Sequence, residues 1–229
     1  MNNLAIIPAR GGSKRIPLKN IKDFLGKPII SYSIEAALKS NLFDEVIVST
    51  DNEKTADLSN QYGAKVPFMR SAENSNDFAT LSDVIYEIVN KYSREGKDFD
   101  NICCILPTAP FLTSSQLSDA ADKMKNESLD SVCTIFKISY PLLRALEFSE
   151  DNKLKMIWPQ YMNTRSQDLK PVYHDAGLFY WVKTSQFMIE KTLLCKNGSA
   201  IILSELEVQD IDDEIEWKMA ELKYKLLHG

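Results

Sequence analysis

Near the start of the chain an apolar run, Leu4-Ala5-Ile6-Ile7, leads directly into Pro8-Ala9-Arg10-Gly11-Gly12-Ser13-Lys14-Arg15-Ile16-Pro17-Leu18-Lys19-Asn20. Four consecutive apolar residues predict a buried strand, and two glycines with four cations follow it at once. Glycine lets backbone N–H groups curl around an anion, arginine offers a fork that matches phosphate oxygens, and lysine supplies a point charge. This arrangement predicts a triphosphate-binding loop at the carboxyl end of the first strand.

The spacing of this loop excludes two common phosphate-binding signatures. It fits neither the G-x-x-x-x-G-K-[ST] pattern of P-loop proteins nor the G-x-G-x-x-G dinucleotide fingerprint. Kinase-type and hydride-transfer functions lose weight accordingly. The alternative is a flexible surface turn, which is disfavoured because Gly-Gly and four cations rarely follow a buried strand without a functional role.

Strands and helices are expected to alternate beyond this loop. Further apolar runs predict strands at 46–48, 102–106, 131–136 and 177–182. Apolar spacing predicts helices at 30–38, 53–62, 81–92, 113–124 and 213–227, the last with Ile215, Met219, Leu222 and Leu226 on one face. The spacing of Thr113 and Gln116 predicts a capping box at the start of the helix at 113–124. Alternation of this kind predicts an α/β fold with a mostly parallel sheet, in which ligands bind beyond the carboxyl ends of the strands. The loops after Ile7, Val48 and Leu106 are the expected site.

Residues 138–171 interrupt the alternation. Three prolines break the segment, and aromatic and methionine side chains gather in it. Such residues are enriched in protein interfaces, so the segment is interpreted as an excursion that packs against another subunit. The alternative is a long loop folded over its own core. The chain is therefore expected to be a single domain, 1–229, with 138–171 as a dimerisation subdomain, to which the resemblance given below adds a sugar site.

The composition excludes several classes of protein. The 229 residues carry 27 Lys and Arg against 32 Asp and Glu, a formal net charge of −5, which disfavours a basic nucleic-acid binder. No apolar run approaches the ~20 residues of a membrane span, and the N-terminus has no positive signal-peptide region. The four cysteines lack zinc-site spacing and are expected to be buried thiols. A cytoplasmic protein without nucleic-acid or membrane partners is expected.

Several further motifs extend this pattern along the chain. They are Val48-Ser49-Thr50-Asp51, Arg70 with Asp77-Phe78-Ala79-Thr80, Leu106-Pro107-Thr108-Ala109-Pro110 and Asp210-Ile211-Asp212. Together with the loop at 7–20, and in this order, they resemble the CMP-sialic acid synthetase family over nearly the whole chain. Arg165-Ser166-Gln167-Asp168-Leu169 and Tyr173-His174-Asp175-Ala176-Gly177 resemble the pseudaminic acid cytidylyltransferase branch.

The resemblance implies a fold, an assembly and a reaction. The fold is a Rossmann-like nucleotidyltransferase, and the assembly is a homodimer whose partner helps to close the sugar site. In the reaction, the anomeric hydroxyl of a nine-carbon 2-keto sugar acid attacks the α-phosphorus of CTP, giving a CMP-sugar and pyrophosphate. The product expected here is CMP-pseudaminic acid, for a surface glycan or glycosylated flagellin.

The resemblance also implies roles for particular residues. Nucleotide contacts are expected from Arg10, Gly11, Gly12, Ser13, Lys14, Asn20, Arg70, Asp77 and Thr80. Sugar contacts are expected from Leu106, Arg165, Gln167, Tyr173, His174 and Asp175. The catalytic set is Arg10, Lys14, Lys19 and Asp212, and the Mg²⁺ ligands are Asp210 and Asp212.

The acidic pair also has a physical reading of its own. Mg²⁺ often takes one or two carboxylates together with substrate oxygens. If the segment is extended, Asp210 and Asp212 point to one side while Ile211 faces the core. The alternative is a helix N-terminus, at which Asp212 or Asp213 is the cap and Glu216 completes the first turn.

Three positions depart from the sialic acid pattern. Leu106 stands where those enzymes tend to carry Gln, residues 174–177 stand where they carry Arg-Pro-Asn-Gly, and Leu81 replaces a hydroxyl residue. Apolar replacements suit a less hydroxylated sugar, because unpaired polar groups penalise the wrong analogue. His174 is interpreted as a substrate contact, a general base or a structural histidine.

Other functions remain open alternatives. Within the class, the product is CMP-N-acetylneuraminate or CMP-legionaminate, or the acceptor is an ordinary sugar phosphate. In a different class, the chain is a non-catalytic nucleotide-binding regulatory module, because fold does not fix function. Charge distribution argues for chemistry: residues 10–27 carry six cations and one acid, and residues 205–216 carry seven acids and no cation. These opposite poles are expected to meet in the fold.

Overall fold

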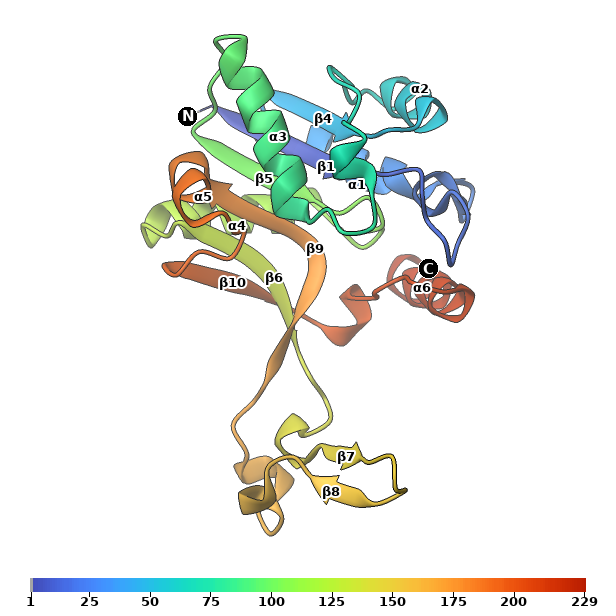
Figure 1. Cartoon of the computed structure of the whole chain (residues 1–229), viewed down its shortest axis with the longest axis vertical. Helices are drawn as coiled ribbons and strands as arrows, with labels where there is room; N and C mark the ends of the chain where they lie inside the picture. The colour runs from blue at the N-terminus through green and yellow to red at the C-terminus, as the bar shows by residue number, and fades with distance from the viewer. Residues whose placement is uncertain (1) are drawn as a thin grey trace.

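The computed structural model describes residues 2–229, and Met1, on which the reading of the N-terminus partly rests, lies outside them. Figure 1 shows a layered body from which one arm projects. The body is built on a six-stranded sheet in the order β10-β6-β9-β5-β1-β4. Its strands are β1 (Asn3–Pro8), β4 (Glu45–Ser49), β5 (Asn101–Ile105), β6 (Ser131–Lys137), β9 (Tyr173–Lys183) and β10 (Gly198–Leu203).

The predicted parallel α/β sheet is confirmed, with one exception at its centre. β1 pairs in parallel with β4 and β5, and β10 pairs in parallel with β6. β9 lies antiparallel between β5 and β6, an orientation that an apolar run alone does not reveal. β10 and a short helix, α5 (Thr184–Glu190), lie where no element was predicted.

Helices cover both faces of the sheet. They are α1 (Ile29–Ser40), α2 (Glu53–Gln61), α3 (Leu81–Arg94) and α4 (Ser114–Asn126), whereas α6 (Glu214–His228) packs on the loop after β1. Alternate residues of β1 enter the two cores: Ala5 and Ile7 lie in one, and Leu4 and Ile6 in the other. Each fully buried side chain of this size contributes about 1.5–3 kcal/mol, which explains the unbroken apolar run. The predicted capping box of Thr113 and Gln116 is present at α4.

A third, smaller core joins the loop after β1 to α6. The loop contains a 3-10 turn, η1 (Lys19–Ile21), and a hairpin of β2 (Asp23–Phe24) and β3 (Lys27–Pro28). Phe24 packs edge-on against Trp217 at 5.6 Å between ring centroids, and Ile16 and Ile211 are buried beside them. This core brings the basic loop and the acidic segment before α6 together.

Residues 138–171 form the arm, which stands away from the body in Figure 1. It contains a two-stranded sheet of β7 (Leu146–Phe148) and β8 (Leu154–Met156), with 3-10 turns η3 (Leu142–Arg144), η4 (Pro159–Tyr161) and η5 (Ser166–Asp168). Its large apolar side chains are exposed, among them Tyr140, Leu146, Phe148, Leu154 and Met162. The segment is therefore not a loop folded over its own core.

α6 buries a different face from the one suggested by its apolar spacing. Trp217 and Ala220 face the body, whereas the predicted set of Ile215, Met219, Leu222 and Leu226 is exposed. An aromatic core selected the buried face, which periodicity alone does not identify. Within residues 2–229, no helix is both long and apolar enough to cross a bilayer. The four cysteines are buried free thiols, as expected.

Candidate active site

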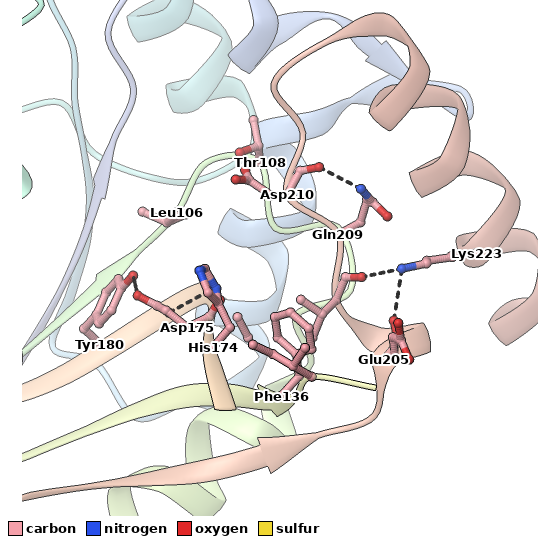
Figure 2. A pocket seen from close by; sticks show the side chains of 14 residues that line it. Leu106, Thr108, Phe136, His174, Asp175, Tyr180, Glu205, Gln209, Asp210 and Lys223 are labelled. Carbon is pink, nitrogen blue, oxygen red and sulfur yellow. Dashed lines mark hydrogen bonds between the residues drawn. The ribbon is translucent and has the colours of Figure 1, made fainter. Parts of the chain in front are cut away.

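Two adjoining cavities open at the carboxyl ends of the parallel strands. The first, which we call the basic cavity, has a volume of about 470 Å³ and is lined by Pro8, Arg10, Ser13, Lys14, Arg15, Lys19, Asn20, Leu81, Leu106, Pro107, Thr108 and Asp212. The second, the acidic cavity, has a volume of about 630 Å³ and contains Asp175, Glu205 and Asp210 (Figure 2). Leu106 and Thr108 line both cavities, so the two spaces meet at the end of β5.

The cations of the basic cavity are paired with acids from distant segments. Asp77 binds Lys14 and also accepts from Arg10 Nη1 at 3.0 Å. Hydrogen bonding and charge from Lys14 hold the pKa of Asp77 below its ordinary value. Arg10 Nη1 also donates to the carbonyl of Asn76 at 3.0 Å. Arg10 and Lys14 therefore converge on a carboxylate that lies 63 or more residues away in sequence.

Asp212 holds the other two cations. Lys19 Nζ lies 3.2 Å from Asp212 Oδ1, and Arg15 Nη2 lies 2.7 Å from Oδ2. Lys19 also donates to the Ile211 carbonyl at 2.5 Å. Burial alone would raise the pKa of Asp212, but Lys19 and Arg15 outweigh it and lower the value. The predicted meeting of the basic and acidic poles is thus observed at Asp212.

The loop after β1 is held by contacts with the segment after β4 and with its own Asn20. The Gly11 N–H donates to Asp51 Oδ1 at 2.7 Å, and a Cβ added to Gly11 would lie 2.9 Å from Asn52 Cβ. Glycine is required by this approach. Asn20 is buried and donates to the Arg10 carbonyl at 2.9 Å. Asn20 therefore fixes the bend of the loop. At Gly12, by contrast, an added Cβ would meet nothing within 4 Å.

Five of the nine predicted nucleotide residues do not line the basic cavity: Gly11, Gly12, Arg70, Asp77 and Thr80. Arg70 donates to Ser49 Oγ at 3.1 Å and to the Ser49 carbonyl at 2.5 Å, and burial lowers its pKa. Thr80 is the N-cap of α3, with Asp83 completing a capping box. Asp77 reaches the cavity only through its cations. Contacts of Arg70, Asp77 and Thr80 with cytidine stay predictions.

The predicted sugar residues divide into two groups. Leu106, His174 and Asp175 line the acidic cavity, together with Phe136, Tyr180 and Lys223, which carry no recognisable motif. Arg165, Gln167 and Tyr173 line neither of the two cavities. Arg165 lies in the arm and pairs with Asp168 at 2.7 Å. Sugar contacts from these three residues also stay predictions.

Lys223 is a cation inside the acidic cavity. Its Nζ donates to the carbonyls of Val208 at 2.7 Å and Glu205 at 3.0 Å (Figure 2). Partial burial lowers its pKa, although the charge of Glu205 acts in the opposite direction. Lys223 thereby ties α6 to η6 (Glu205–Glu207), the turn that leads to Asp210.

The acidic segment before α6 is not helical: Asp210 and Ile211 have no regular secondary structure, and Asp212 lies in a bend. Ile211 is buried in the third core, while Asp210 lines the acidic cavity and Asp212 the basic one. Asp213 is the N-cap of α6 and forms a capping box with Glu216. Capping therefore uses Asp213 and leaves the two alternate carboxylates at the cavities.

The pair fits a magnesium ion that is shared with substrate. Among residues 2–229, no group of three or more His, Cys, Asp or Glu side chains lies close enough to hold a metal by itself. Mg²⁺ does not require such a cage, because one or two carboxylates plus phosphate oxygens commonly suffice. Asp210 and Asp212, which line the two adjoining cavities, are compatible with that donor set.

Comparison with known proteins identifies relatives over nearly the whole chain. A pseudaminic acid cytidylyltransferase of Campylobacter jejuni is 40% identical over 228 residues, which is 100% of this chain and 98% of the relative. A CMP-N,N'-diacetyllegionaminic acid synthase of Legionella pneumophila is 32% identical over 224 residues, 96% of this chain and 95% of the relative.

A solved structure extends the comparison to the fold. A CMP:2-keto-3-deoxy-manno-octonic acid synthetase in complex with CTP superposes with a TM-score of 0.71 at 17% identity, covering 100% of this chain and 99% of the other. The model of the family described as "Cytidylyltransferase" matches residues 4–210. The chain therefore belongs to the cytidylyltransferase family.

Proposed function

We propose that this protein transfers CMP from CTP to the anomeric hydroxyl of pseudaminic acid and releases pyrophosphate. The observation that carries the proposal is the pair of cavities that meet at Leu106 and Thr108, one basic and one with polar and apolar walls. The sugar is chosen because identity is higher to the pseudaminic acid enzyme than to the legionaminic acid enzyme.

The basic cavity supplies the triphosphate site. Arg10, Ser13, Lys14 and Lys19 bind the phosphates, and Lys19 neutralises charge at the α-phosphate. In the reaction a bond forms between the anomeric oxygen and the α-phosphorus, and the anomeric hydroxyl loses its proton. The bond from the α-phosphorus to the α,β-bridging oxygen of CTP breaks, and that oxygen leaves with pyrophosphate. Such transfers depend on positioning and charge neutralisation, with little covalent chemistry from the protein.

Asp210 and Asp212 would hold Mg²⁺ in this proposal. The ion would supply further neutralisation of the triphosphate. Because Asp212 pairs with Lys19 and Arg15, binding of nucleotide and metal exchanges protein ion pairs for phosphate ion pairs. The protein's own contribution is to deliver the two carboxylates on a non-helical segment, in which buried Ile211 lies between them and Asp213 caps α6 directly after them.

The sugar lies in the acidic cavity. Leu106 and Phe136 present apolar surface to a sugar poor in hydroxyl groups, and His174 presents a polar edge. His174 Nδ1 lies 2.9 Å from the Asp175 carbonyl, which only accepts, so Nδ1 carries the proton and Nε2 is left as an acceptor. Asp175 lies beside His174 in the wall of this cavity, whereas Tyr173 lines neither cavity and its contact with the sugar stays a prediction.

We also propose a homodimer in which a second copy supplies Arg165 and Gln167. The support is the arm, whose exposed Tyr140, Phe148 and Leu154 have no partner in the body, and the exposed apolar face of α6. Arginine binds carboxylates with a bidentate fork, which suits the sugar acid. Sedimentation analysis should give a dimer, and replacing Phe148 and Leu154 with Glu should give a monomer.

A substrate panel tests the proposed reaction. Incubation with CTP, Mg²⁺ and pseudaminic acid should release pyrophosphate faster than incubation with N-acetylneuraminic acid, legionaminic acid or a sugar phosphate. Faster release with N-acetylneuraminic acid would move the assignment to the sialic acid branch. CTP binding by calorimetry without turnover of any sugar would instead support a regulatory module. We propose that the reaction occurs in the cytoplasm, because CTP is a cytoplasmic metabolite. Its product would serve the synthesis of a surface glycan or glycosylated flagellin.

A further inference from the structure

Strand β9 does not stay in register with β6 along its whole length. Tyr180 pairs with Cys133, but Asp175 pairs with Ile135, so five residue steps on β9 face two steps on β6. The three extra residues lie within 176–179, which we call the β9 bulge. Bulges bend a strand and re-aim its side chains, often beside functional sites.

Asp175 closes the β9 bulge from one side. Its Oδ1 accepts the N–H of Gly177 at 2.8 Å, and its Oδ2 accepts the hydroxyl of Tyr180 at 2.5 Å. Gly177 has φ +63°, a left-handed conformation that favours glycine. Both oxygens of Asp175 are therefore occupied within the chain, at the two ends of the extra residues.

The β9 bulge positions two groups of the acidic cavity. The Leu106 N–H donates to the Leu178 carbonyl at 2.9 Å, which fixes the end of β5 against the bulge. His174 Nδ1 is held by the carbonyl of Asp175 at 2.9 Å. In Figure 2, Tyr180 points at Asp175 while the His174 ring lies toward Leu106. A change in the bulge would move both Leu106 and His174.

Tyr180 is a buried donor to this arrangement. Its side chain packs in the core with Cys104 and Cys133, and only 8% of its surface is exposed. Burial, with the hydrogen bond to Asp175, raises the pKa of the Tyr180 phenol above its ordinary value. The hydroxyl therefore remains a donor across the range of pH in which the enzyme is assayed.

We propose that Tyr180 and Asp175 are a positioning pair that holds the β9 bulge and so sets the geometry of the sugar site. They act through His174, Leu106 and the bulge backbone, whereas the cations of the basic cavity come from the loop after β1. This inference rests on the proposed function, because it assigns the acidic cavity to the sugar. In this role Asp175 shapes the sugar site and does not need to contact the sugar itself.

The test is Tyr180→Phe, which removes one hydroxyl and leaves the ring in place. We expect the KM for pseudaminic acid to rise roughly tenfold or more, because small misplacements at a reacting site are costly. We expect the KM for CTP to stay within about twofold, since Tyr180 does not line the basic cavity. A uniform fall in kcat with both KM values unchanged would overturn the inference.

Tyr92→Phe is a matched control. Tyr92 is also a buried tyrosine on this face of the sheet, and its hydroxyl donates to Glu45 Oε2 at 2.8 Å. It lines neither the basic nor the acidic cavity. Tyr92→Phe should lower thermal stability without changing the KM for either substrate. An equal rise in the sugar KM for this control would show that lost stability alone explains Tyr180→Phe.

A spectroscopic measurement separates this inference from the proposed function. The chain has two histidines, so a His228→Gln background leaves His174 as the single imidazole. Its ring nitrogens should give the Nδ1–H tautomer by NMR, and Tyr180→Phe should shift both signals, whereas Tyr92→Phe should not. Unshifted signals would overturn the positioning pair even if the enzyme turns over. Shifted signals in a protein without turnover on any sugar would keep the pair and defeat the proposed function.

Discussion

The basic and acidic cavities are built in opposite ways. Most residues that line the basic cavity come from one continuous stretch, 8–20, and its shape follows from a loop that glycine and a buried Asn20 bend. The acidic cavity collects residues from β5, β6, β9, η6 and α6, and its shape follows from a register slip in β9. Site residues that come from one segment form a motif that can be recognised in the sequence. Site residues that strand pairing brings together do not form such a motif.

The largest effect should come from Asp212, at which the two charge poles meet. Asp212→Asn removes the acceptor charge for Lys19 and Arg15 and one proposed Mg²⁺ ligand. We expect turnover to fall by roughly 10²-fold or more, as for other single electrostatic groups in active sites. Pyrophosphate release measures the loss, and circular dichroism should show an unchanged fold.

The neighbouring residue provides the control for this change. Asp213→Asn alters the next acidic side chain, but asparagine caps a helix about as well as aspartate does. Activity should remain near that of the wild type. Full activity in Asp212→Asn, or an equal loss in both variants, would contradict the assignment of Asp212 to catalysis.

A smaller effect is expected at Leu106, where the cavities touch. Leu106→Gln restores the polar group expected of sialic acid enzymes, so kcat/KM for pseudaminic acid should fall roughly tenfold or more. Activity with N-acetylneuraminic acid should rise, and the KM for CTP is the internal control. If CTP and sugar parameters change together, Leu106 does not separate the two cavities.

Asp77 tests whether the basic cavity is occupied by its own acid before nucleotide binds. Asp77→Asn frees Arg10 and Lys14, so the Kd for CTP should fall about two- to fivefold, in the range of exposed ion pairs. The gain should shrink as salt is added, because exposed charges are screened. Calorimetry at two salt concentrations measures both effects. Weaker binding would instead support the predicted contact between Asp77 and cytidine.

The smallest effect concerns the loop that carries Asp77. Glu87 accepts from Ser71, Asn74 and Lys91, and although burial opposes them, these donors lower the pKa of Glu87 to about 2. A lowered folded-state pKa gives stability that is present above the ordinary value of 4.5 and is lost as pH falls toward about 2. Urea unfolding of Glu87→Gln should therefore show a flatter acid limb than the wild type.

Glu73→Gln is the control for the pH experiment, since Glu73 is exposed in the same loop. Its acid limb should follow that of the wild type. A wild-type slope in Glu87→Gln would show that the Ser71 and Asn74 contacts do not persist in solution.

The sequence predicted local features well and pairing features poorly. The strand at 4–7 and the capping box at Thr113 depend on neighbouring residues, and each is observed. The antiparallel direction of β9 and its bulge depend on which strands flank it, information that the run at 177–182 does not contain.

The same distinction explains α6 and the site residues. Four apolar residues at helical spacing mark a face of α6, but Trp217 lies on the face that the aromatic core selects. Leu106 and His174 were found because they follow or begin recognisable motifs. Tyr180 and Lys223 were missed because a tyrosine in an apolar strand and a lysine in a helix resemble core and surface residues.

The arm enters and leaves the body at a single point. The Ile138 N–H donates to the Val172 carbonyl at 3.0 Å, so the two ends of the segment are already joined where β6 and β9 separate. Doubling the length of a loop with closed ends costs only about 0.6 kcal/mol of closure entropy. The length of the arm should therefore have little effect on the stability of the sheet beneath it.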